Sequence, residues 1–277
     1  MASHVMRAAA EHLVPVTLEL GGKSPVIISK SADMKKSAAR IMTGKTLNAG
    51  QICLAPDYVM VPKEDMESFI DEATKSTEAM FPSLKDNSDY TSIINQRHYD
   101  RLNSYLDDAR AKGATIIEIN PKNEDFSQQP HFKIPPTIVV EPTDDMKIMQ
   151  EEIFGPILPV KSYGKVEEAI QYVNDHDRPL GLYYFGEDNA EENKVIERTT
   201  SGGVSVNDVL THIMQDDAPF GGVGPSGTGS YHGHEGFKNF SHAKTIFRQT
   251  GLEFAAGMLR PPYGKKIENV LKSMLKD

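Results

Sequence analysis

The sequence predicts an α/β fold with a mostly parallel sheet and flanking helices. Short apolar runs with strand periodicity alternate along the chain with segments whose apolar residues recur at helical spacing. Parallel strands need such crossover helices, so strict alternation favours a parallel sheet. The length of 277 residues allows one large or two moderate domains, at roughly 100 to 200 residues per domain.

The first predicted strand covers residues 15–20, where apolar and polar side chains alternate before Gly21-Gly22 ends the pattern. Further strands are predicted at residues 25–28, 58–61, 115–119, 137–140, 157–162, 182–185 and 203–206. Helices are predicted at residues 5–13, 33–42, 63–80, 96–112, 166–174 and 190–199.

The character of the sequence changes at Asp216. Seven glycines lie between Gly221 and Gly236, which predicts a long glycine-rich loop. The last apolar pattern, within residues 267–275, predicts one amphipathic helix.

Composition excludes several classes of protein. Acidic residues outnumber basic ones by 39 to 30, and no segment clusters Lys and Arg, so nucleic acid is not expected as a partner. No apolar stretch reaches the roughly 20 residues of a membrane-spanning helix, and no signal-peptide pattern opens the chain. These observations predict a cytoplasmic protein without a membrane partner.

The single cysteine, Cys53, is the first candidate for chemistry. It lies in a turn-forming segment, residues 48–56, between a predicted helix and a predicted strand. Gly50 lets the backbone approach a ligand closely and leaves amides free to stabilise an oxyanion. The alternative is an inert buried thiol. An internal disulfide or a thiolate-rich metal site cannot form from one cysteine.

Glu19 is the second candidate, at the end of its predicted strand. A carboxylate that faces a cleft at the carboxyl end of a parallel strand is well placed for general-base work. The alternative is a solvated carboxylate at a strand end. Together, Cys53 and Glu19 could perform covalent acyl chemistry, in which the thiolate attacks and the carboxylate activates water.

Two other motifs point to structure rather than chemistry. Residues 222–227 match G-x-G-x-x-G, but no strand is predicted before them and Pro225 opposes a helix start, so a structural loop is favoured. His232 and His234 lack further ligands at metal spacing, so no metal is predicted.

Four motifs resemble NAD(P)-dependent aldehyde dehydrogenases. They are residues 18–25 (LELGGKSP), 50–53 (GQIC), 151–156 (EEIFGP), and 220–222 (FGG) with 226–227 (SG). Residues 55–58 (APDY), 229–233 (GSYHG) and 240–242 (FSH) are similar to the class 3 enzymes, and within these to the bacterial coniferyl aldehyde dehydrogenases.

The resemblance implies a role for each matching residue. Cys53 would be the nucleophile that adds to the aldehyde, and Glu19 the base that activates water against the thioester. Glu152 would hold the nicotinamide ribose of NAD or NADP, with Phe154 packing nearby. Leu20 and Gly21 would lie beside the nicotinamide, and Asn207 matches a further family position.

The resemblance also implies how the chain is divided. Residues 1–20 would end the cofactor-binding domain, residues 21–222 would form the catalytic domain, and residues 223–277 would return to the cofactor domain or a dimer interface. Most of the Rossmann-like cofactor domain would be missing. We therefore expect a truncated, weak or inactive aldehyde dehydrogenase that forms a homodimer. The alternatives are an NAD-independent thiol esterase and a non-catalytic oligomerisation fragment.

Overall fold

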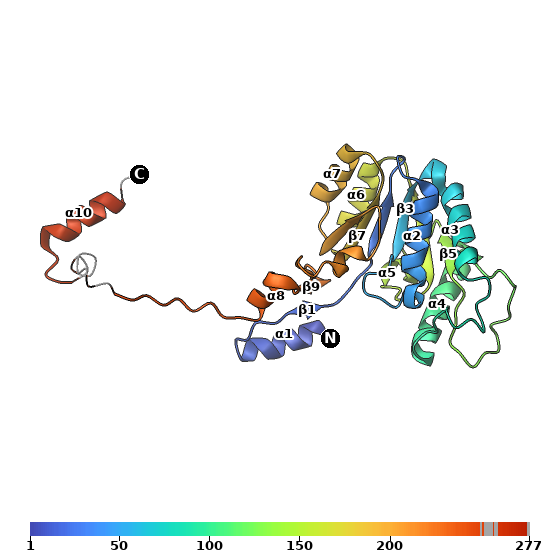
Figure 1. Ribbon diagram of the computed structural model, residues 1–277, viewed down its shortest axis with the longest axis horizontal. Coiled ribbons are helices and arrows are strands. Elements are labelled where there is room, and N and C mark those ends of the chain that lie inside the picture. Colours follow the sequence, from blue (N-terminus) through green and yellow to red (C-terminus); the bar gives the residue numbers. More distant parts are fainter. Residues whose placement is uncertain (250, 252–256, 258–259, 276–277) are drawn as a thin grey trace. The chain divides into compact units, whose positions relative to one another are not determined.

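The computed structural model describes residues 1–249, 251, 257 and 260–275. The chain forms two compact units, Met1–Phe240 and Ser241–Asp277. The first unit contains a seven-stranded sheet, a two-stranded sheet and helices beside the larger sheet (Figure 1). The predicted α/β fold with a mostly parallel sheet is confirmed.

The large sheet has the strand order β4-β5-β6-β3-β2-β7-β8. Its strands are β2 (Pro25–Ile28), β3 (Tyr58–Pro62), β4 (Thr115–Glu118), β5 (Thr137–Val140), β6 (Ile157–Tyr163), β7 (Gly181–Phe185) and β8 (Gly203–Val206). Only the edge pair β4 and β5 is antiparallel. In this order β2 and β3 lie side by side, with β6 next to β3 and β7 next to β2.

Helices cover both faces of this sheet. The first unit contains α1 (Ala2–Glu11), α2 (Met34–Thr46), α3 (Met66–Met80), α4 (Gln96–Ala111), α5 (Lys147–Gln150), α6 (Val166–Asn174), α7 (Asn189–Arg198) and α8 (Gly233–Asn239). Short 3-10 turns lie at η1 (Leu47–Gly50), η2 (Lys63–Asp65) and η3 (Thr211–Met214). Asp33, Asn95 and Asp188 accept backbone N–H bonds at the starts of α2, α4 and α7, which explains where these helices begin.

Alternation along the central strands divides the core in two. In β2, Val26 and Ile28 pack with α2 and α3, whereas Ile27 packs on the opposite face with α4, α6 and α7. All three side chains are fully buried, and burying one such side chain contributes about 1.5–3 kcal/mol. The packing on both faces holds the sheet in place, so the segments that lead into β2, β3 and β6 can carry a site.

Two predictions along the chain are wrong. Residues 15–20 do not form a strand of the main sheet: only β1 (Leu18–Glu19) is extended, paired antiparallel with β9 (Gly227–Thr228). The stretch from Asp216 is not all loop, since it contains β9 and α8. Its glycines permit this compact folding, because a Cβ on Gly222 would lie 2.2 Å from the Ser226 carbonyl oxygen.

The second unit contains α10 (Gly264–Met274), which confirms the predicted amphipathic helix. Within the described residues, none of the helices combines the length and apolar character required to cross a membrane. The predicted domain boundaries at residues 20 and 222 stay predictions, and part of the predicted segment 223–277 lies outside the described residues.

Candidate active site

Cys53 lies between η1 and β3, as the sequence predicts. Its side chain is partly buried against a small apolar cluster formed by Leu54, Leu180 and Phe220. Tyr183 in β7 is fully buried and donates a hydrogen bond of 2.6 Å from its hydroxyl to the Leu54 carbonyl oxygen. The residue that follows the cysteine is therefore fixed to the central sheet.

A left-handed turn precedes the cysteine. Asn48, Ala49 and Gly50 have φ angles of 51°, 52° and 72°, a conformation that costs a residue such as alanine about 1–3 kcal/mol. The Gln51 side-chain amide offsets this cost, since it donates to the carbonyl oxygens of Asn48 and Ser92, each at 3.0 Å. Side-chain contacts thus hold the backbone in this conformation.

Gly50 approaches another backbone segment closely. A Cβ at this position would lie 2.4 Å from the Gly155 carbonyl oxygen. The backbone at Gly155 fills the space that a side chain at Gly50 would need, and the expectation that Gly50 lets the backbone approach a ligand stays a prediction. The glycine lets the Cys53 segment pack against the segment that carries Glu152.

Glu19 lies on β1, opposite Gly227 of β9. It stands at the end of an antiparallel pair, so its predicted place on a parallel strand is wrong. The residue is exposed, yet partial desolvation of its carboxyl raises the pKa of Glu19. A carboxylate that is reachable by water and has a raised pKa suits a general base.

Cys53 is subject to the charges of both Glu19 and Glu152. Burial raises the pKa of Cys53 most, and the negative charges of Glu19 and Glu152 raise it further. The backbone N–H groups of Cys53 and Leu54 act in the opposite direction because they stabilise a thiolate. The thiol is therefore held protonated beside two proton acceptors.

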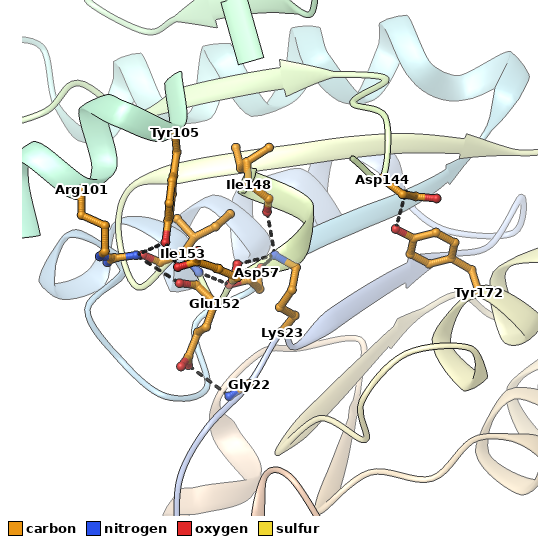
Figure 2. A network of polar contacts seen from close by, with 11 residues as sticks. Gly22, Lys23, Asp57, Arg101, Tyr105, Asp144, Ile148, Glu152, Ile153 and Tyr172 are labelled. Atoms are coloured by element: carbon orange, nitrogen blue, oxygen red, sulfur yellow. Dashed lines mark hydrogen bonds and ion pairs between the residues drawn. The ribbon is translucent and has the colours of Figure 1, made fainter. Parts of the chain in front are cut away.

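Glu152 follows α5 and is joined to the Glu19 segment. Gly22 donates its backbone N–H to Glu152 Oε1 at 3.1 Å (Figure 2). Burial raises the pKa of Glu152 to about 7, while the Gly22 N–H lowers it, Asp57 raises it, and Lys23 and Arg101 lower it. This carboxyl changes its charge near neutral pH.

A cavity of about 560 Å³ opens beside Glu152. Leu20, Gly21 and Glu152 lie in its wall, so three of the predicted cofactor residues meet there. Among the described residues, Cys53 and Glu19 are not part of this wall. The predicted residues therefore form two groups. The thiol side consists of Cys53, Glu19 and Glu152, and the cavity side consists of Leu20, Gly21 and Glu152, so Glu152 belongs to both.

Phe154 and Asn207 occupy special backbone positions. Phe154 is 39% exposed with a φ of 49°, so the turn presents its ring at the surface. Asn207 holds the ends of β7 and β8 together, since its amide accepts from Gly186 N at 2.9 Å and donates to Gly186 O at 2.8 Å. These contacts show that Asn207 stabilises the ends of the two strands.

Two further residues were not singled out as site residues by the sequence. Burial raises the pKa of Tyr231, and the charges of Glu19 and Cys53 raise it further, so this ring lies at the thiol side. Burial lowers the pKa of His212, whose Nδ1 pairs with the Ser205 hydroxyl at 2.8 Å. Tyr231 occurs in the GSYHG motif, which was a usable signal, whereas His212 lies in no recognised motif.

The described residues contain no group of three or more His, Cys, Asp or Glu side chains that could hold a metal ion. The site therefore consists of a thiol, two carboxylates, backbone N–H groups and an adjoining cavity. Such a set can perform covalent chemistry on a carbonyl compound, with a carboxylate to move protons.

The chain belongs to the aldehyde dehydrogenase family, whose model matches residues 1–246. This confirms the resemblance drawn from the four motifs. Among its relatives, the chain is 63% identical to a probable coniferyl aldehyde dehydrogenase of Caulobacter vibrioides, over 100% of this chain and 57% of that protein. It is 56% identical to a coniferyl aldehyde dehydrogenase of a Pseudomonas species, over 99% of this chain and 57% of that protein.

Solved structures show the same likeness. A substrate-bound AldH of Staphylococcus aureus matches with a TM-score of 0.88 and 40% identity, over 99% of this chain and 58% of that chain. Betaine aldehyde dehydrogenase of Staphylococcus aureus in complex with NAD+ matches with a TM-score of 0.77 and 30% identity, over 86% of this chain and 48% of that chain. The chain thus spans about half the length of the proteins it matches.

Proposed function

We propose that this chain is the catalytic-domain part of an NAD(P)-dependent aldehyde dehydrogenase that converts an aldehyde to its carboxylic acid. Coniferyl aldehyde is the first substrate to test, because the Caulobacter and Pseudomonas relatives carry its name. The observation that carries the proposal is that the charges of Glu19 and Glu152 both act on the Cys53 thiol, while Gly22, three residues after Glu19, donates its N–H to Glu152.

Cys53 acts as the nucleophile in this proposal. The thiol loses its proton to a neighbouring carboxylate, and its sulfur forms a bond to the aldehyde carbon, so the carbonyl oxygen becomes an oxyanion. The N–H groups of Cys53 and Leu54, which already favour negative charge on the sulfur, are available to stabilise that oxygen. The product of this step is a thiohemiacetal on Cys53.

Glu19 acts as the base for hydrolysis. After oxidation the acyl group is held on Cys53 as a thioester, and water must lose a proton to attack it. Glu19 is exposed and partly desolvated, so it can take that proton from a water molecule that reaches the site. The acid is then released and the thiol is restored.

The residues around Glu152 fit the nicotinamide end of NAD or NADP. The carboxyl binds the Gly22 N–H through one oxygen and leaves acceptor capacity for ribose hydroxyls. Gly21 lies in the cavity wall, and a Cβ at this position would lie 2.8 Å from Glu152 Oε1, so the glycine leaves room for the Glu152 carboxyl at this wall. The bound nicotinamide would supply the hydride acceptor, and Glu152, Leu20, Gly21 and Phe154 would orient it.

The same proposal includes a division at residues 20 and 222, a homodimer and a cytoplasmic location. The proposal also includes weak NAD binding and poor turnover by this chain, because the chain spans 57% of the length of these two relatives. The part of the relatives that this chain does not match would supply the rest of the cofactor site.

The test compares this chain with the product of the intact gene in an assay of NAD reduction by coniferyl aldehyde. The longer protein should form NADH, its Cys53→Ala variant should form none, and this chain should be weak. Ester turnover without NAD reduction in both proteins would instead favour a thiol hydrolase.

A further inference from the structure

One buried carboxylate of the Cys53 segment contacts the two other segments that carry candidate site residues (Figure 2). Asp57 lies four positions after Cys53, and its side chain is buried. Its Oδ1 pairs with Lys23, which follows Gly22, and its Oδ2 accepts the backbone N–H of Ile153 at 2.9 Å. We infer that Asp57 is a positioning residue that sets the Cys53, Glu19 and Glu152 segments relative to one another.

Lys23 extends this connection along the Glu152 segment. Besides Asp57, its ammonium donates to the carbonyl oxygens of Ile148 at 2.8 Å and Glu151 at 3.0 Å. The lysine thus binds a carbonyl of α5 and the residue directly before Glu152. Charge-assisted bonds of this kind are stronger than neutral ones, and they are least screened where the groups are buried.

The backbone reinforces the same arrangement. Asp57 donates its own N–H to the Ser24 carbonyl oxygen at 2.8 Å, so the Cys53 segment and the Glu19 segment are also joined directly. Arg101 of α4 donates to the carbonyl oxygens of Glu152 at 3.2 Å and Ile153 at 2.7 Å. The Glu152 segment is therefore held through its main chain, and the Glu152 carboxyl, which accepts the Gly22 N–H, keeps acceptor capacity for a ligand.

The chemistry explains why an aspartate suits this position. A carboxylate offers two oxygens, and here one receives an ammonium while the other receives a backbone N–H. Asparagine would keep one acceptor and lose the charge, so the Lys23 ammonium would be left without its counter-ion. The contacts of Asp57 with Lys23 and Ile153 are a property of the fold. The catalytic roles of Cys53, Glu19 and Glu152, which these contacts would position, rest on the proposed function.

Hydrogen exchange of this chain, measured by mass spectrometry, tests the inference without any enzyme activity. In Asp57→Asn we expect exchange in peptides that cover residues 147–156 and 19–24 to rise at least about tenfold, while peptides from α6 keep their protection. Lys23→Met should affect residues 147–153 in the same direction, and Lys23→Arg should restore part of the protection.

Lys161→Met is the matched control. Lys161 also binds a carboxylate and a carbonyl oxygen, Asp144 Oδ1 at 2.8 Å and Pro142 O at 3.1 Å, but it contacts none of the three segments. It should leave both groups of peptides unchanged. The rate at which iodoacetamide alkylates Cys53 should change at least about threefold in Asp57→Asn and remain unchanged in Lys161→Met.

Unchanged exchange in Asp57→Asn and Lys23→Met would overturn the inference. A uniform rise across all peptides would overturn it too, since that result would mean general destabilisation. If Asp57→Asn does not fold, Lys23→Met decides by the same criteria. If the longer protein lacks dehydrogenase activity while this chain shows the local exchange pattern, the proposed function is contradicted and the positioning role is supported.

Discussion

Gly22 and Glu152 are 130 positions apart in the sequence, yet the backbone N–H of Gly22 lies 3.1 Å from Glu152 Oε1. This bond joins the segment that carries Glu19 to the segment that carries the ribose-binding candidate. The N–H lowers the pKa of Glu152, but burial raises it more, to about 7. The carboxyl therefore accepts a hydrogen bond in the folded chain and still changes its charge near neutral pH.

The raised pKa of Glu152 predicts a pH-dependent cost of folding. An acid with a higher pKa in the folded chain binds its proton more tightly there, so its contribution to the free energy of unfolding falls as pH rises from 4.5 to about 7. Glu152→Gln removes that loss. Relative to wild type, the variant should gain about 1–3 kcal/mol between pH 5 and pH 8 in urea unfolding. Glu67→Gln, at an exposed position of α3, should gain nothing, and an equal difference at both pH values would contradict the assignment.

Gly21→Ala should displace the Glu152 carboxyl. The new Cβ would lie 2.8 Å from Glu152 Oε1, at a φ of +116° that alanine rarely adopts. We expect a loss of about 1–3 kcal/mol in the free energy of unfolding. Gly113→Ala is the control for backbone strain alone, because its φ is +82° and nothing lies within 4 Å of its Cβ. If Gly21→Ala lowers the free energy of unfolding no more than Gly113→Ala does, the Glu152 carboxyl does not need the space beside Gly21.

Tyr183→Phe should loosen the residue that follows the cysteine. It removes the 2.6 Å hydrogen bond to the Leu54 carbonyl oxygen and leaves a buried acceptor without its partner, at a cost of about 1–3 kcal/mol. The rate of Cys53 alkylation should change as well. Tyr184→Phe is the matched control, since its hydroxyl binds the Glu191 side chain instead. Identical effects of both variants on Cys53 alkylation would argue against this role of Tyr183.

Glu19→Gln should make Cys53 more reactive towards iodoacetamide. The negative charge of Glu19 raises the pKa of Cys53, so its removal lowers that pKa and increases the thiolate fraction at pH 7. We expect the alkylation rate to rise about twofold to tenfold. Cys53 is the one cysteine in the sequence, so the label reports on this site alone. Glu67→Gln is the reference variant. An alkylation rate in Glu19→Gln equal to that in Glu67→Gln would show that the Glu19 charge does not act on Cys53.

Most of the fold could be predicted from the sequence because its elements are locally encoded. The strand Pro25–Ile28 is a continuous apolar run, and Asp33 is a good N-cap directly before α2. The errors arose where tertiary contacts decide. Residues 15–20 have strand periodicity, but only Leu18 and Glu19 find a partner strand, and that partner lies more than 200 positions away in β9.

The site was predictable residue by residue, but its connections were not. Cys53, Glu19 and Glu152 lie in motifs, whereas the bonds that Asp57 makes to Lys23 and Ile153 depend on strand order, which local patterns do not specify. Gly50 shows the same limit. Its special conformation could be anticipated, but its neighbour, the Gly155 carbonyl, could not.

Acetyl transfer from p-nitrophenyl acetate tests the roles of Cys53 and Glu19 without a cofactor. Cys53 should be the nucleophile that takes up the acetyl group, and Glu19 should be the base that activates water to release it. Intact-mass measurements should show one acetyl group on the wild-type chain during turnover. The acetylated form should accumulate and persist in Glu19→Gln, because its hydrolysis lacks the base, and should be absent in Cys53→Ser. Acetylation that survives in Cys53→Ser, or deacetylation as fast in Glu19→Gln as in wild type, would contradict the account.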